Sequence, residues 1–162
     1  MKTATRLLPT VLLALASLTA SAQSTAKKMT KEYINPPTLP KSTPGYSQAV
    51  AVRGGRTIYV AGQVGANLQG ELVGRGDLRT QLAQAFQNLG AALTAAGAKP
   101  QDVVKMNYYV VNYSPNMLPI IREERNRFFT SSDNPPVSTL VGVSSLYQEG
   151  VLVEMEAVAV TE

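Results

Sequence analysis

Two acidic residues lie inside an apolar segment close to the end of the chain, Val151-Leu-Val-Glu-Met-Glu-Ala-Val-Ala-Val160. The segment is typical of a strand, in which side chains alternate between two faces. Glu154 and Glu156 therefore share one face, while Val153 and Met155 point to the core. An ionised carboxylate is costly to bury without partners. The two acids either hydrate an outer sheet face or look into a subunit interface or a pocket, where a carboxylate can position or deprotonate a water molecule.

The composition restricts the available chemistry. The 162 residues include no His, no Cys and no Trp. The chain therefore cannot form a Ser-His-Asp triad, a Cys nucleophile, a zinc site with nitrogen or sulfur ligands, or a disulfide. Acid-base work is left to Glu, Asp, Lys and Tyr, with Arg as a permanent cation. We predict no cofactor and no metal site.

The first 22 residues have the pattern of an export signal. Lys2 and Arg6 precede an apolar stretch over residues 7–18, and Ala20-Ser-Ala22 offers a small-residue cleavage site. We predict cleavage after Ala22 and a periplasmic or secreted location. No later segment is continuously apolar over about 20 residues, so no membrane association is expected after cleavage.

The remaining chain suits one domain. Residues 23–45 contain four prolines and are expected to run extended or irregular, and residues 46–162 form the domain. The formal net charge is +4. The clustered lysines Lys27, Lys28 and Lys31 are interpreted as a solvated tail, because no basic run is interleaved with aromatic residues. We therefore expect no nucleic-acid partner.

The pattern along residues 46–162 alternates between strands and helices. Tyr46–Val52 and 57–61 are expected as two strands of a hairpin that turns at Gly54-Gly55. Asp77 is a typical N-cap, and apolar residues at three- and four-residue spacing predict one helix up to Gly97. A strand is predicted over 102–113, a shorter helix over 118–129, and two strands over 139–146 and 151–160.

This order predicts an α/β (α+β) fold, in which a mixed sheet carries both helices on one face. The opposite face is left apolar enough to need a partner. We therefore expect the protein to form oligomers.

Several segments, taken together and in this order, resemble the RidA/YjgF family: Pro44-Gly-Tyr-Ser-Gln-Ala-Val50, Ala61-Gly-Gln63, Gln87-Asn-Leu-Gly-Ala-Ala-Leu93 with Ala96-Gly97, Asp102-Val-Val-Lys105, Arg127-Phe-Phe129 and Val153-Glu-Met-Glu-Ala157. The resemblance covers nearly the whole chain after the signal. It implies a chorismate-mutase-like fold, a homotrimer, and three clefts for small metabolites at the subunit interfaces.

In the best-known branch of that family, an Arg near the start of the penultimate strand grips the substrate carboxylate. That branch hydrolyses reactive enamines and imines made by pyridoxal-phosphate enzymes. The Arg position falls on Ser138 here. A bidentate guanidinium contact contributes about 1.5–3 kcal/mol, against about 1 kcal/mol for a neutral hydroxyl, so a carboxylate should bind about tenfold more weakly.

The other residues implied by the resemblance are preserved unevenly. Tyr46 and Gln63 match ligand-binding positions, and Glu154 matches the Glu that positions water in deaminating members. Arg122 stands where the active branch has Asn, and Ala61 where it has Ser. Arg122 either restores the missing cation or belongs to a solvated run of alternating charges with its neighbours in the sequence.

Three functions remain open at this point. The first is a trimeric protein that binds a small metabolite, with enamine or imine deamination absent or retargeted. The second is an active enamine/imine deaminase in which Glu154 positions water. The third, ribonuclease activity, would need an unusual acid-base pair in a chain without His.

Overall fold

The computed structural model describes residues 28–42, 45–131 and 133–162. The predicted export signal, residues 1–22, lies outside the described residues. Among those described, no helix is both long and apolar enough to cross a membrane. In chain order the elements are β1 (Thr30–Ile34), β2 (Ala49–Arg53), β3 (Arg56–Val64), α1 (Leu78–Ala95), η1 (Pro100–Asp102), β4 (Val103–Val111), η2 (Pro115–Met117), α2 (Leu118–Phe128), β5 (Val137–Val143) and β6 (Val153–Thr161).

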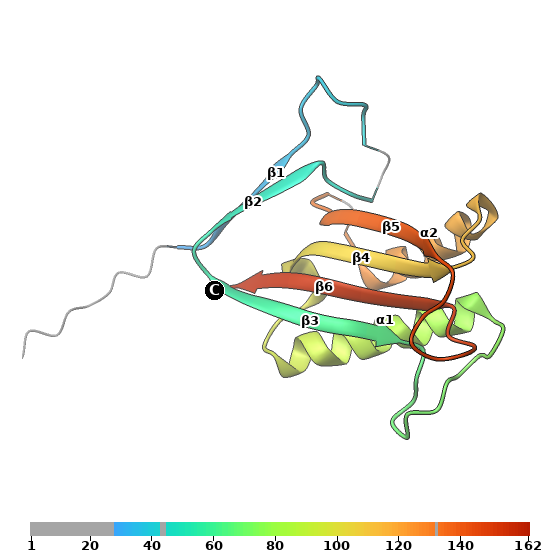
Figure 1. Cartoon of the computed structure of the whole chain (residues 1–162). Helices are drawn as coiled ribbons and strands as arrows, with labels where there is room; N and C mark the ends of the chain where they lie inside the picture. Colours follow the sequence, from blue (N-terminus) through green and yellow to red (C-terminus); the bar gives the residue numbers. More distant parts are fainter. Residues whose placement is uncertain (1–27, 43–44, 132) are drawn as a thin grey trace, which may run out of the picture.

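A four-stranded mixed sheet forms the centre of the domain, with the strand order β3-β6-β4-β5. Strands β4 and β5 are parallel, and the other two pairings are antiparallel. Parallel neighbours need a crossover connection, which α2 supplies between β4 and β5. Both helices lie on one face of the sheet, and β1 and β2 form a separate hairpin that projects from it (Figure 1). The predicted mixed sheet with two helices on one face is confirmed.

Helix α1 begins and ends where the sequence predicts. The Asp77 carboxylate accepts hydrogen bonds from the backbone N–H groups of Arg79 (3.0 Å) and Thr80 (3.4 Å). Hydrogen bonds from Thr80, side chain first and then backbone, lower the pKa of Asp77. Gly97 has φ of 75° directly after the cap residue Ala96, in the left-handed region that favours glycine.

The core lies between the helices and the inner face of the sheet. Leu82, Leu89 and Leu93 of α1 are fully buried. On β6 the burial alternates as expected, since Val153 and Met155 are buried while Glu154 and Glu156 are half-buried.

No described helix covers the outer face of the sheet (Figure 1). Tyr59 on β3 is 81% exposed there and Val141 on β5 is 40% exposed. The interstrand register puts Tyr59 and Val141 on the same face as the two acids of β6. This face therefore mixes apolar surface with carboxylates.

The predicted pairing of the two strands that flank Gly54-Gly55 is wrong. Strand β2 pairs antiparallel with β1, a strand within the segment expected to be extended or irregular, and β3 pairs with β6. Both glycines have positive φ, which frees the direction of the chain after β2. Lys31 of β1 holds the hairpin over η1 by donating to the Asp102 carbonyl (3.2 Å) and pairing with its carboxylate (3.5 Å).

A buried amide joins α1 to two loops. Gln81 is fully buried, and its Nε2 donates to the carbonyls of Gly74 (3.2 Å) and Gly150 (2.9 Å). Its Oε1 accepts from the backbone N–H of Leu152 at 2.8 Å. The side chain therefore ties the loop before α1 to the start of β6.

We expect Gln81→Met to lower the free energy of unfolding by about 2–4 kcal/mol, because three buried groups lose a partner and each bond contributes about 1 kcal/mol. Urea unfolding followed by circular dichroism measures the change. Gln87→Met, at an exposed position of the same helix, is the control and should stay within about 0.5 kcal/mol of the wild type. Equal effects of the two substitutions would show that the amide does not hold the loops.

Candidate ligand-binding cleft

A cleft opens where α2, β5 and the segment before β2 meet. Three of the residues that the sequence singled out, Tyr46, Arg122 and Ser138, line it together. They come from three distant parts of the chain. The complete lining is Gly45, Tyr46, Tyr108, Leu118, Ile121, Arg122, Arg125, Ser138 and Leu140.

Hydrogen bonds to a proline-rich segment place Tyr46 beside the start of β5. The hydroxyl of Ser47, which is buried, donates to the Pro135 carbonyl at 2.8 Å. The backbone N–H of Ser47 donates to the Pro136 carbonyl at 3.1 Å. Because Ser138 follows two residues after Pro136, these bonds bring the tyrosine and the serine to one cleft.

The charges of α2 are separated onto different sides of the helix. The carboxylate of Glu124 is buried and pairs with Arg79 of α1 (2.8 Å) and with Arg127 (2.7 Å). Glu123 pairs with the same two arginines, at 2.8 and 2.7 Å. Within the described chain Arg122 forms no ion pair and no hydrogen bond, and it lines the cleft. The acids next to Arg122 in sequence are therefore already neutralised, which favours the interpretation of Arg122 as a cleft cation.

A second cation, which the sequence analysis did not single out, stands beside the first. Arg125 lies three residues after Arg122 on the same helix and also lines the cleft. Its Nη1 donates to the Gly45 carbonyl at 3.2 Å, and its Nη2 donates to Asn126 Oδ1 at 2.7 Å. Burial, and then the nearby charge of Arg122, lower the pKa of Arg125. The helical spacing was the signal that could have revealed it.

The contact with Arg125 explains why position 45 is a glycine. A Cβ at Gly45 would lie 1.7 Å from Arg125 Nη1, and the residue has φ of 121°. Any side chain there would collide with the guanidinium and strain the backbone. The glycine before Tyr46 therefore suits the presence of an arginine at position 125.

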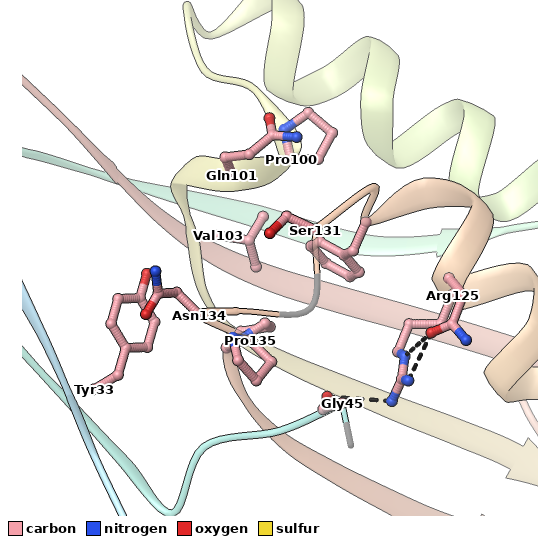
Figure 2. Close-up of a pocket in the computed structure, with 12 residues that line it drawn as sticks. Tyr33, Gly45, Pro100, Gln101, Val103, Arg125, Ser131, Asn134 and Pro135 are labelled. Atoms are coloured by element: carbon pink, nitrogen blue, oxygen red, sulfur yellow. Dashed lines mark hydrogen bonds between the residues drawn. The ribbon is translucent and has the colours of Figure 1, made fainter.

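Gly45 and Arg125 also line a second pocket. Figure 2 shows Arg125 at one end of this pocket, with its guanidinium directed at Gly45, and Tyr33 of β1 at the other end. Phe129 and Pro135 also line this pocket. Arg125 and Gly45 are thus the two residues that line both the cleft and this pocket.

An unpartnered hydroxyl lies at the cleft. Tyr108 of β4 lines it and is only 3% exposed. In the part of the chain that is described, its Oη has no hydrogen-bond partner. Burial raises the pKa of Tyr108, against a smaller opposing effect of Arg125. Its ring packs edge-on against Phe86 at 6.3 Å between centroids.

Two predicted site residues, Glu154 and Gln63, lie outside the cleft. Glu154 is on the outer face of the sheet, and Gln63 of β3 donates from its amide to the Ala61 carbonyl at 3.1 Å. Neither lines the cleft. A Cβ at Gly62 would lie 1.7 Å from Glu154 Oε1, so the carboxylate rests directly on that glycine. Glu154 forms no hydrogen bond or ion pair with the described residues.

The chemistry of the cleft follows from its lining. Two guanidinium groups and two hydroxyl-bearing aromatic residues face an opening that none of the described carboxylates lines. Such an arrangement favours an anionic ligand. Among the described residues that line the cleft there is no carboxylate and no Lys, so acid-base work within one chain is left to the two tyrosines.

Comparisons with known proteins agree with this architecture. A relative from Dermatophagoides farinae named 2-iminobutanoate/2-iminopropanoate deaminase is 38% identical over 132 residues, which cover 82% of this chain and 98% of the relative. The human protein of the same name is 36% identical, covering 71% of this chain and 79% of its own. A Rid-family protein of unknown function from Yersinia pestis, YyfB, has 42% identity and a TM-score of 0.76, covering 81% of this chain and 98% of its own.

The family model that matches is described as Endoribonuclease L-PSP and spans residues 37–161. RidA from the Antarctic bacterium Psychrobacter is similar in structure, with a TM-score of 0.58 and 30% identity over 80% of this chain and 99% of its own. With the family model matched over most of the chain and relatives above 30% identity along nearly their whole length, the protein belongs to the RidA/YjgF family.

Proposed function

We propose that the protein binds a small carboxylate-bearing metabolite in the cleft between α2 and β5, with the deaminase chemistry of its relatives absent or retargeted. The observation that carries the proposal is the position of Arg122. It lines the same cleft as Ser138, the residue that stands in place of the clamp Arg, and it has no ion pair within the described chain. Arg122 on the helix would then do the work that the resemblance assigns to an Arg on the strand.

We further propose a homotrimer in which a second copy completes each cleft. The uncovered outer face of the sheet, with Tyr59 and Val141 exposed, supports an interface there. Glu154 lies on this face and cannot reach Arg122 within one chain, because α2 packs on the opposite side. A neighbouring subunit could bring the two charges together, which would give the half-buried carboxylate a partner.

The second candidate is an active imine deaminase, which the names of several relatives favour. In this case Glu154 of a neighbouring copy would orient water toward the imine carbon, while Arg122 holds the carboxylate. Gln63, near the end of β3, would contribute a polar contact to the ligand. The ribonuclease function is our third choice, because the cleft lining offers no acid-base pair for it.

Removing the cation should weaken binding of a simple 2-oxo acid. We expect Arg122→Gln to raise the Kd of 2-oxobutanoate, a stable analogue of an imino acid, by about tenfold or more, since a charge-assisted contact contributes about 1.5–3 kcal/mol. Isothermal titration calorimetry measures the affinity.

Arg53→Gln is the matched control for the lost charge, because Arg53 is exposed on β2 and does not line the cleft. Its Kd should stay near the wild-type value. If both variants bind as the wild type does, Arg122 is not the clamp.

The deaminase question has its own test. We expect the wild-type protein not to accelerate ammonia release from 2-iminobutanoate generated in the assay, and we expect Ser138→Arg to raise the rate, because the guanidinium returns to the strand position that the family uses. A coupled ammonia assay measures both. Wild-type acceleration that disappears in Glu154→Gln would instead establish the second candidate.

The trimer predicts a matched pair of effects. Val141→Asp places a charge on the proposed interface, where burial without a partner costs several kcal/mol. We therefore expect this variant to dissociate at micromolar concentration. Leu68→Asp, at a fully exposed loop position, should remain trimeric. Sedimentation velocity distinguishes the species, and a wild-type monomer would contradict both the trimer and the shared cleft.

A further inference from the structure

The cleft holds more binding capacity than a monocarboxylate needs. Arg122 and Ser138 together suffice to hold one carboxylate. Arg125 adds a second positive charge to the same lining, and Tyr108 adds a hydroxyl that is nine-tenths or more buried. The proposed function assigns no ligand contact to these two residues.

The unpartnered hydroxyl is the more informative of the two. A buried polar group without a hydrogen bond costs about 1–3 kcal/mol, so such groups are rare unless a ligand or water satisfies them. The neighbouring Tyr109 provides a contrast, because its hydroxyl donates to Glu156 at 3.2 Å on the other face of the sheet. Of the two adjacent tyrosines, only the one at the cleft lacks a partner among the described residues.

The lining also carries two positive charges, on Arg122 and Arg125. Arg122 and Arg125 lie close enough for the charge of the first to lower the pKa of the second. Each of the described acids of α2 pairs with arginines outside the cleft. Each of the two guanidinium groups in the lining can therefore contact a separate carboxylate of one ligand.

We propose that the preferred ligand is a dicarboxylate, a 2-oxo or 2-imino acid that carries a second carboxylate at the far end of its chain. Arg122 and Ser138 hold the first carboxylate, and Arg125 with Tyr108 Oη holds the second. This proposal rests on the proposed function and names its ligand class. Because the Tyr108 hydroxyl is buried in the free chain, the second carboxylate reaches it by shifting the Arg125 side chain, which is long and flexible.

The test compares two ligands that share a 2-oxo acid head and nearly the same shape. The first, 2-oxoglutarate, ends in a carboxylate; the second, 5-methyl-2-oxohexanoate, ends in two methyl groups. Calorimetric titration of the full-length folded protein should show 2-oxoglutarate binding about tenfold or more tightly, as expected for a second charge-assisted contact. Equal affinities would overturn the dicarboxylate proposal and leave the proposed function in place.

Tyr108→Phe removes only the hydroxyl and should reduce that preference by at least about fivefold. The melting temperature of the ligand-free variant should not fall, because the hydroxyl has no partner to lose. Tyr109→Phe is the control and should keep the preference. A Tyr108→Phe variant that retains the full preference, or that melts lower without ligand, would show that the hydroxyl serves folding alone. If neither 2-oxo acid nor 2-oxobutanoate binds, the proposed function itself fails.

Discussion

The buried carboxylate of Glu124 fixes the rotation of α2 about its own axis. Arg79 of α1 and Arg127 hold it at 2.8 and 2.7 Å, and a buried carboxylate needs such partners to remain charged. Successive helical residues turn by about 100°, so a rotation by one residue would expel this carboxylate from its partners. With Glu124 directed at α1, Arg122 and Arg125 are left on the cleft side. The electrostatic character of the cleft therefore depends on an ion pair that does not belong to it.

Three positions at which the sequence is expected to depart from the family pattern lie at one cleft. They are Ser138 on the strand, Arg122 on the helix, and Gly45 before Tyr46. The structure relates the last of these to Arg125, whose guanidinium occupies the space that any Cβ at position 45 would need. The cations of this cleft thus lie on the helix α2.

Local patterns predicted the elements that local forces determine. The alternation of β6 and the cap at Asp77 are both set by neighbours in sequence, and both are confirmed. The hairpin across Gly54-Gly55 failed because contacts far along the chain, such as Lys31 with Asp102, decide where β2 lies. Arg125 was recoverable from its spacing to Arg122. Tyr108 was not, because its significance depends on which hydrogen bonds are missing in three dimensions.

The lining of the cleft comes from chain positions 45–46, 108, 118–125 and 138–140. The cleft forms only when β4 has paired with β5, α2 has packed beside them, and Ser47 has bonded to the Pro135 carbonyl. Contacts so distant in sequence carry a high loop-closure entropy and form late in folding. Partly folded chains therefore lack the cleft, so any metabolite that occupies it acts selectively on the finished fold. Ligand concentration then becomes a determinant of how long the native protein survives.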